Sequence, residues 1–286
     1  MELLQQQDIK ELVEIAIRED IGNGDHSSLA CIPADKNGQA YCIAKEAGVI
    51  AGIDLAAYIF KRIDPSLRFE PSVKDGDNIE QGDLIFNIFG SDISILTAER
   101  LVLNFMQRLS GIATQSRKIS TLLKDYHTVV LDTRKTTPGM RLLEKWAVRL
   151  GGSSNHRIGL YDMIMIKDNH IDFAGGISQA IEKTHQYLKF KGLDLKIEIE
   201  TRNLEEVKEV IAIGGIHRIM LDNFNPTQLK EAIALIDSKF ETEASGGITL
   251  DTIQDYAASG VDYISVGALT HSSKSIDLSL RVLKSN

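Results

Sequence analysis

The second half of the chain repeats short apolar runs, each followed by a polar loop and, in most cases, by an amphipathic helix. The runs predict six strands, over residues 128–132, 162–167, 195–200, 218–222, 240–245 and 263–267. Helical spacing of apolar residues predicts helices such as 203–213 and 227–236 between them. Strands that alternate with helices form βαβ units around a parallel sheet. The pattern predicts an incomplete α/β barrel, with an open doubly wound sheet as the competing architecture.

The first part of the chain mixes α and β patterns. Apolar residues on one face predict a helix over residues 9–17, and the run Gly22-Asn23-Gly24-Asp25 ends it. Two Gly-Asp pairs within residues 71–90 are typical of hairpin turns. A long helix is expected from about Ile95 to Leu123.

Charged residues alternate with apolar ones in two of the predicted barrel strands. Their polar faces consist of Lys196, Glu198 and Glu200 in one strand and of Glu241, Glu243 and Ser245 in the other. The apolar faces must pack against helices, so the charged faces are expected to point into the barrel. Buried carboxylates are costly unless they are paired or bind a cation, so Glu198, Glu200, Asp222 and Glu243 require Lys, Arg or a metal nearby. The alternative is a solvated sheet edge, where such charges are ordinary surface.

Residues 131–170 are basic, with seven Lys and Arg against four Asp and Glu, in a chain whose net charge is −8. Arg141, Lys145 and Arg149 recur every four residues, as expected on an exposed helix face. The remaining cationic groups follow strand ends or Gly-rich turns; they are Arg134, Lys135, His156, Arg157 and Lys167. Because Arg binds carboxylates and phosphates bidentately and Lys acts as a point charge, this set favours a substrate with several negative charges.

Two glycine turns follow the last two predicted strands. They are Ser245-Gly246-Gly247 and Gly267-Ala268. Phosphate sites of α/β barrels are often built from these last loops, although turn chemistry alone also explains such glycines.

Composition narrows the class of protein. The chain has 286 residues, 43% apolar and 25% charged, which is ordinary globular usage. The acidic balance argues against a general nucleic-acid binder, and no apolar run approaches the roughly 20 residues of a membrane span. The N-terminus lacks signal-peptide features. Cys31 and Cys42 form no disulfide framework or zinc pattern, which fits a cytoplasmic protein.

A series of motifs along nearly the whole chain resembles the quinolinate phosphoribosyltransferase family. The series consists of Glu19-Asp20-Ile21-Gly22-Asn23-Gly24-Asp25, Ala44-Lys45-Glu46-Ala47-Gly48, Asp132-Thr133-Arg134-Lys135-Thr136-Thr137-Pro138-Gly139, Gly151-Gly152-Ser153-Ser154-Asn155-His156-Arg157, Ile166-Lys167-Asp168-Asn169-His170, Leu221-Asp222-Asn223-Phe224, Ala244-Ser245-Gly246-Gly247 and Val266-Gly267-Ala268-Leu269-Thr270-His271. Departures from the family pattern are slight: Ser27-Ser28 stands where a threonine is common, and Thr136-Thr137 is a permitted variation.

The resemblance implies an N-terminal α/β sandwich domain over residues 1–112 and the incomplete α/β barrel of type II phosphoribosyltransferases over residues 113–271. A C-terminal helix over residues 272–286 is expected to pack back on the first domain. The resemblance also implies a homodimer, or a hexamer built from dimers, in which each active site takes one arginine from the neighbouring subunit. The implied reaction joins quinolinate and 5-phosphoribosyl 1-diphosphate and releases diphosphate and CO₂.

The resemblance also implies roles for individual residues. Catalytic roles are expected for Lys135, Glu200 and Asp222, of which the two carboxylates lie near the ribose and Mg²⁺, with the metal held directly or through the substrate diphosphate. The cationic pocket is expected to comprise Arg134, Lys135, His156, Arg157 and Lys167, with Arg100 supplied by the partner subunit. The 5′-phosphate cradle is expected to comprise Ser245, Gly246, Gly247, Gly267 and Ala268.

Other functions compete with this interpretation. Nicotinate phosphoribosyltransferase takes a single carboxylate and releases no CO₂. A paralogue found with molybdate transport has a related pocket. An aldolase would use Lys167 at a strand end as a Schiff-base amine, and a metabolite-binding module would bind both substrates without releasing diphosphate.

Overall fold

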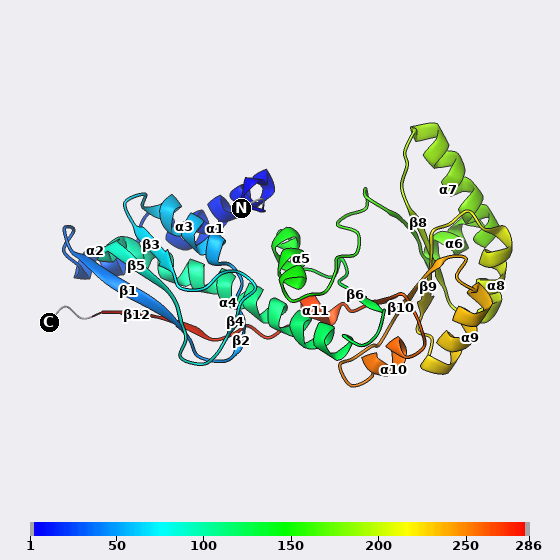
Figure 1. Ribbon diagram of the computed structural model, residues 1–286. Coiled ribbons are helices and arrows are strands. Elements are labelled where there is room, and N and C mark those ends of the chain that lie inside the picture. Colours follow the sequence, from blue (N-terminus) through cyan, green and yellow to red (C-terminus); the bar gives the residue numbers. More distant parts are fainter. Residues whose placement is uncertain (1–2, 284–286) are drawn as a thin grey trace. The chain divides into compact units, whose positions relative to one another are not determined.

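The structure is a computed structural model that describes residues 3–283 (Figure 1). The chain forms two compact units. The first combines Met1–Lys118, Thr136–Gly152 and Leu269–Asn286, and the second combines Ile119–Lys135 and Ser153–Ala268. The predicted division between residues 112 and 113 lies close to the first crossing, but the segment 136–152, expected in the barrel, groups with the first unit.

The first unit contains a four-stranded antiparallel sheet of order β12-β1-β5-β3 and a two-stranded sheet of β2 and β4. Its strands are β1 (Asn37–Ala44), β2 (Gly48–Val49), β3 (Arg68–Pro71), β4 (Asn78–Ile79), β5 (Leu84–Ser91) and β12 (Leu278–Val282). The helical elements of this part of the chain are η1 (Leu3–Gln5), α1 (Gln7–Ile21), α2 (His26–Cys31), α3 (Ile53–Ile63), α4 (Asp92–Leu122), α5 (Arg141–Leu150) and α11 (Ala268–His271).

Aromatic packing joins α3 to the larger sheet. Phe60 of α3 lies 5.8 Å from Phe86 of β5 and 5.9 Å from Phe69 of β3, measured between ring centroids. Phe60 and Phe86 are almost fully buried, so they contribute strongly to this core. The start of α3 is capped by Asp75, whose carboxylate accepts the backbone N–H groups of Gly52 and Ile53.

One expectation about this unit is wrong. The predicted C-terminal helix over 272–286 is instead strand β12, which pairs antiparallel with β1; residues 284–286 lie outside the described residues. Alternating apolar residues in Leu278–Val282 suit a strand beside an open sheet edge. Both Gly-Asp turns of residues 71–90 lie in the connection between β3 and β5, which pair antiparallel, and β4 within this connection pairs with β2.

The second unit is built on a six-stranded parallel sheet. Its strands are β6 (Val129–Leu131), β7 (Ile164–Ile166), β8 (Ile197–Thr201), β9 (Arg218–Asp222), β10 (Glu241–Ser245) and β11 (Tyr263–Ser265), in the order β6-β11-β10-β9-β8-β7. The intervening helices are α6 (Asp168–Ala174), α7 (Ile177–Lys191), α8 (Leu204–Ile213), α9 (Pro226–Ile236) and α10 (Ile253–Ala257). Helices α7, α8 and α9 lie along the outer side of the sheet (Figure 1).

The strand order supports an incomplete barrel and contradicts the doubly wound alternative. Strands β7 to β11 follow one another in sequence order, and β6 then pairs with β11, as when a ring closes. A doubly wound sheet would reverse its order at a switch point. Among the described residues β6 and β7 do not pair, and the free edge of β6 instead bridges Leu131 to Ser154.

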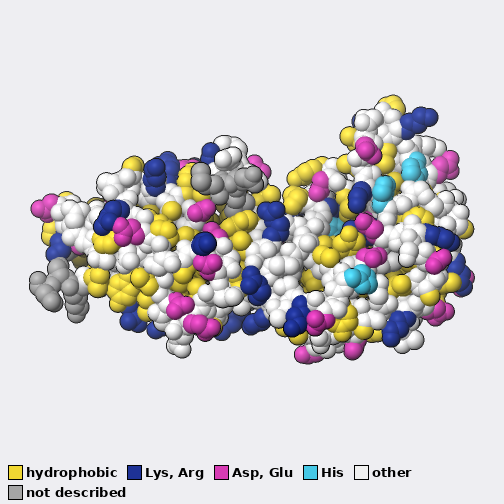
Figure 2. Space-filling view, viewed as in Figure 1, with side chains coloured by type: hydrophobic (Ala, Val, Ile, Leu, Met, Phe, Trp, Pro, Cys, Tyr) yellow, Lys and Arg dark blue, Asp and Glu magenta, His cyan; other side chains and the backbone are white. Residues whose placement is uncertain are grey.

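None of the described helices combines the length and the apolar character that a bilayer crossing requires. On the face drawn in Figure 2, Lys and Arg side chains are interspersed with Asp and Glu.

Candidate active site

The carboxyl ends of the parallel strands carry most of the predicted site residues. In parallel α/β barrels this edge hosts the reactive groups, because the loops that follow the strands converge there. Lys167 follows β7, Glu200 lies near the end of β8, and Asp222 and Ser245 end β9 and β10. One edge of one sheet therefore gathers these four side chains.

The charged faces of β8 and β10 point into the barrel, as predicted. Glu198 and Glu243 have no exposed surface, and Glu200 is 8% exposed. The solvated-edge alternative is therefore wrong for these three residues. Lys196 and Glu241, at the opposite ends of the same strands, remain partly exposed.

Lys167 and Glu200 form an ion pair at the ends of neighbouring strands. The Lys167 Nζ lies 3.2 Å from Glu200 Oε2, and the two strands pair through Ile166 and Ile199. The lysine is held at the start of α6, where its backbone N–H donates to Nδ1 of His170. His170 therefore has a structural role at the start of α6.

Asp222 and the glycine turn after β10 form a second group. The Ser245 hydroxyl and the Asn223 amide both donate to the Asp222 carboxylate. Gly246 has φ +91°, and a Cβ there would lie 2.1 Å from Asn223 Oδ1. The turn therefore requires glycine at residue 246, which leaves backbone exposed beside two strand ends.

Arg134 and Arg157 bring positive charges together. Burial lowers the pKa of Arg157, and the nearby positive charge of Arg134 lowers it further. The Arg157 guanidinium donates to the backbone oxygen of Met163 at 3.0 Å. Arg134 Nε is buried and finds no acceptor among the described residues. Two converging arginines with an unmatched buried donor suit an anionic ligand.

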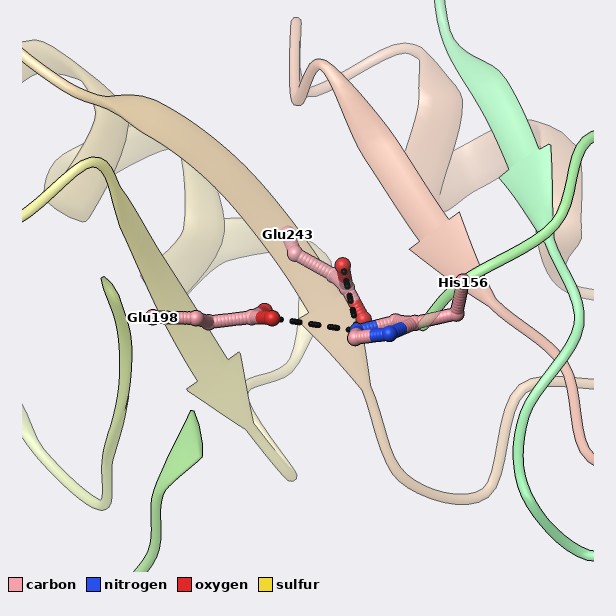
Figure 3. Close-up of side chains that lie close together, drawn as sticks. All are labelled: His156, Glu198 and Glu243. Atoms are coloured by element: carbon pink, nitrogen blue, oxygen red, sulfur yellow. Dashed lines mark ion pairs between the residues drawn. The ribbon is translucent and has the colours of Figure 1, made fainter. Parts of the chain in front are cut away.

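His156, which precedes Arg157 in the chain, is buried. Its backbone N–H donates to Asp132 at 2.9 Å, and the same carboxylate accepts the side-chain amide of Asn155. The imidazole Nε2 lies 3.0 Å from Glu198 and 3.5 Å from Glu243 (Figure 3). Arg218 pairs with Glu243 at 2.8 Å from the neighbouring strand.

Burial and charge act in opposite directions on the pKa values of this buried network. Burial lowers the pKa of His156, but hydrogen bonds and charges of Glu198 and Glu243 raise it to about 9. Burial and the charge of Glu243 raise the pKa of Glu198 to about 7. The backbone N–H of Arg157 donates to His156 Nδ1 at 2.7 Å. A second ring proton would occupy that acceptor, so this contact places the ring proton on Nε2, on the side of the carboxylates.

Other predicted residues are more peripheral. Lys135 is exposed in the loop after β6, and Gly267 and Ala268 follow β11 directly. Arg100 is exposed on α4 and is the predicted site residue that belongs to the first unit. Lys145, expected on an exposed stripe with Arg141 and Arg149, is instead buried on α5.

Two family models together match most of the chain. The model "Quinolinate phosphoribosyl transferase, N-terminal domain" matches residues 25–110, and its C-terminal counterpart matches residues 112–281. The chain belongs to the quinolinate phosphoribosyltransferase family. The incomplete barrel and its charged strand ends are therefore those of a quinolinate phosphoribosyltransferase, which confirms the resemblance of the motifs.

Individual relatives agree with this assignment. The chain is 47% identical to "Quinolinate phosphoribosyltransferase [decarboxylating] 2, mitochondrial" from Nicotiana glauca, over 96% of this chain and 82% of that protein. It is 43% identical to "Probable nicotinate-nucleotide pyrophosphorylase [carboxylating]" from Bacillus subtilis, over 97% and 94%. The crystal structure of NadC from Streptococcus pyogenes matches with a TM-score of 0.90 and 41% identity, over 96% and 97%.

Sequence reasoning missed two side chains of this quinolinate phosphoribosyltransferase site. Arg218 pairs with Glu243, and it lies in register with Glu198 on one side and Glu241 on the other. Aligning the starts of the predicted strands would have found it, because cross-strand neighbours share a face. Asp132 was recognised only as part of a motif, although an acidic residue directly after the apolar run of residues 129–131 was a signal.

A separate cavity of about 570 Å³ opens at the amino ends of the barrel strands. It is lined partly by Lys196, His217, Lys239 and Tyr263. None of the predicted site residues lines it, and in parallel α/β barrels the chemistry lies at the other end of the strands.

Proposed function

We propose that this quinolinate phosphoribosyltransferase family member transfers a phosphoribosyl group from 5-phosphoribosyl 1-diphosphate to quinolinate. The products are nicotinate mononucleotide, diphosphate and CO₂, which makes the chain a pentosyltransferase of NAD biosynthesis. The names of its relatives, including one described as decarboxylating, support this reaction.

The observation that carries the proposal is the pair Arg134 and Arg157. Their charges lie close enough to lower the pKa of Arg157, and Arg134 holds a buried N–H that no described residue accepts. A dicarboxylate offers two acceptor groups and two negative charges, which satisfy both guanidinium groups. His156 and Lys167 add cation-capable groups at the same end of the barrel.

The transfer step suits acidic side chains near the ribose. The pyridine nitrogen forms a bond to ribose C1 while the bond from C1 to the diphosphate oxygen breaks, and positive charge develops on the ribose. Glu200 and Asp222 place negative potential beside that charge, and Lys135 and Lys167 neutralise the leaving diphosphate. The bond to the 2-carboxylate then breaks, and the ring carbon beside the pyridinium nitrogen takes a proton.

The glycine turns serve the donor's 5′-phosphate in this proposal. Ser245 contributes a hydroxyl, and the loops after β10 and β11 supply backbone N–H groups, which can donate hydrogen bonds to an anion. The residues involved are Ser245, Gly246, Gly247, Gly267 and Ala268. The absence of side chains at the glycines allows the phosphate to approach the backbone closely.

Mg²⁺ is the cofactor in this proposal. Mg²⁺ is usually held by one or two carboxylates and by substrate phosphates, and Glu200 and Asp222 provide two carboxylates at adjacent strand ends. In the part of the chain that the structure describes, no third acidic or histidine ligand joins them. The residues therefore fit a metal carried largely by the diphosphate, where it supplies charge neutralisation of the leaving group.

The proposal includes a homodimer, or a hexamer of dimers, in which Arg100 of one subunit completes the site of another. Arg100 is exposed on α4, as this role requires. A cytoplasmic location is also part of the proposal, since Cys31 and Cys42 are both free thiols, which persist in reducing compartments.

One coupled assay tests the reaction. Purified protein is mixed with 5-phosphoribosyl 1-diphosphate, Mg²⁺ and either quinolinate or nicotinate, and diphosphate and CO₂ are measured together. We expect equal amounts of both products with quinolinate. Turnover of nicotinate without CO₂ would support nicotinate phosphoribosyltransferase instead, and substrate binding without diphosphate release would support a binding module. Chelation with EDTA is expected to stop diphosphate release, and added Mg²⁺ to restore it.

A further inference from the structure

Two fully buried carboxylates take no part in the proposed phosphoribosyl transfer. They are Glu198 of β8 and Glu243 of β10. Figure 3 shows both pointing toward His156 from their two strands. Their nearest oxygens lie 3.0 Å and 3.5 Å from the imidazole Nε2. Neither carboxylate has any exposed surface, so neither reaches a substrate directly.

Arg218 balances only part of this charge. Its guanidinium donates to Glu243 at 2.8 Å and to Glu241 at 3.0 Å. Both oxygens of Glu198 are buried and make no hydrogen bond among the described residues, although the His156 Nε2 lies 3.0 Å from one of them. A buried carboxylate without a hydrogen-bond donor costs free energy. A ring proton directed toward Glu198 therefore stabilises this carboxylate.

The other ring nitrogen contacts the backbone of Arg157. His156 Nδ1 accepts the backbone N–H of Arg157 at 2.7 Å. It must therefore carry a lone pair, and the ring proton sits on Nε2, toward the carboxylates. The three groups would also suit a metal, since their ligand atoms lie within 4.8 Å of one another. A metal requires the Nε2 lone pair, which this tautomer does not offer.

We propose that Glu198 and Glu243 are positioning residues, which fix the His156 ring so that it holds the backbone of Arg157 in place for quinolinate binding. The inference rests on the proposed function. Arg157 is then anchored at both ends, by His156 at its amide and by Met163 at its guanidinium. Displacing a substrate-binding group by about 1 Å is enough to weaken its action severely.

The test compares Glu198→Ala with Glu198→Gln and with Glu241→Ala. The alanine variant removes the acceptor and leaves the Arg218–Glu243 pair intact, whereas glutamine keeps an acceptor oxygen of the same shape. Glu241 is the matched control, because it pairs with the same Arg218 but does not contact His156. KM for each substrate and kcat are measured separately.

We expect Glu198→Ala to raise KM for quinolinate about tenfold or more, with kcat and the KM for the phosphoribosyl donor within about threefold of wild type. Glu198→Gln should recover most of the quinolinate affinity, and Glu241→Ala should behave as wild type. In a His156→Ala background, Glu198→Ala should have no further effect on KM. Three results would overturn the inference: an equal rise in KM for both substrates, a fall in kcat alone, or additive effects of the two substitutions in the double variant.

A measurement on the wild-type protein covers the case in which Glu198→Ala does not fold. Nitrogen-15 NMR of labelled histidine distinguishes the two neutral tautomers, and we expect proton attachment at Nε2 of His156. A proton on Nδ1, or a stoichiometric transition metal in the purified protein, would overturn the inference. Failure of wild-type protein to turn over quinolinate would instead overturn the proposed function, while the tautomer result stands independently.

Discussion

At the scale of single residues, the site depends on charges whose partners are incomplete within the protein. Arg134 keeps a buried N–H for which residues 3–283 provide no acceptor, and Arg157 lies beside that like charge. Such an arrangement costs free energy in the empty protein and regains it when an anion binds. The positions of these two arginines are therefore better explained by ligand binding than by stability.

Replacing Arg157 with alanine tests this directly. A charge-assisted hydrogen bond contributes about 1.5–3 kcal/mol, so Arg157→Ala should raise KM for quinolinate by about 10- to 100-fold. Steady-state kinetics with each substrate varied in turn measure it. The control is Arg202→Ala, which removes an exposed arginine that pairs with Glu206 in the same unit. An unchanged quinolinate KM in the folded Arg157→Ala protein would refute the assignment.

Gly246 allows a second prediction about a single residue. In Gly246→Ala the new Cβ would lie 2.1 Å from Asn223 Oδ1, at a backbone φ of +91°. We expect the loop to shift and KM for 5-phosphoribosyl 1-diphosphate to rise about tenfold, because the proposed phosphate cradle depends on this backbone. Gly82→Ala, at φ +98° in the other unit with open space around it, controls for backbone strain alone. Similar donor KM values in both variants would contradict the phosphate assignment.

At the scale of elements, the periodicity of apolar residues predicted the barrel strands, but it did not predict every strand or which strands pair. All six barrel strands and the inward charged faces of β8 and β10 follow from alternation and spacing, because a parallel sheet between helices forces that pattern. The fate of Leu278–Val282 depends on a strand more than 230 residues away, β1, so local pattern could not decide between helix and strand.

Lys145 and Arg218 show the same limit for side chains. An i, i+4, i+8 spacing places Lys145 on one helix face, but burial of that face depends on what packs against α5. Arg218 opens its strand as an ordinary surface residue would, and its partners Glu243 and Glu241 become visible only in the sheet register. The local sequence determines which residues share a face of a helix or strand, whereas tertiary contacts decide which of these faces are buried.

Gly111 of α4 shows how an element depends on its neighbour. A Cβ at this position would lie 2.1 Å from the backbone oxygen of Lys274, in the segment leading to β12. Replacing a helical glycine with alanine normally stabilises by about 1 kcal/mol. We expect Gly111→Ala to destabilise the protein instead, by about 1–3 kcal/mol, because backbone cannot give way cheaply. Urea unfolding measures this change.

The control for Gly111→Ala lies in the same helix. Asn104 is exposed on α4, so Asn104→Ala gains helix propensity without a clash and should leave stability equal or slightly higher. If both variants were stabilised alike, the close approach of α4 to residue 274 would not hold.

At the scale of the whole molecule, the proposed site residues divide between the two units. Arg100 belongs to the first unit, and the other predicted site residues belong to the second. If each site takes Arg100 from the partner subunit, the Arg100 and the Lys167 of one site belong to two different chains. The dimer then allows complementation between two inactive variants, which a site built from one chain does not allow.

We therefore expect Arg100→Ala and Lys167→Ala to be nearly inactive alone and to recover activity when their subunits are exchanged. Random exchange of equal amounts makes half of the dimers mixed, and one of the two sites in each mixed dimer has both residues, so about a quarter of wild-type activity should return. Exchange is confirmed by mass spectrometry of differently tagged chains. Mixing Lys167→Ala with Glu200→Ala is the matched control, since both changes lie in the second unit and should not complement. Confirmed exchange without recovery in the first mixture would show that Arg100 acts within its own chain or outside the site.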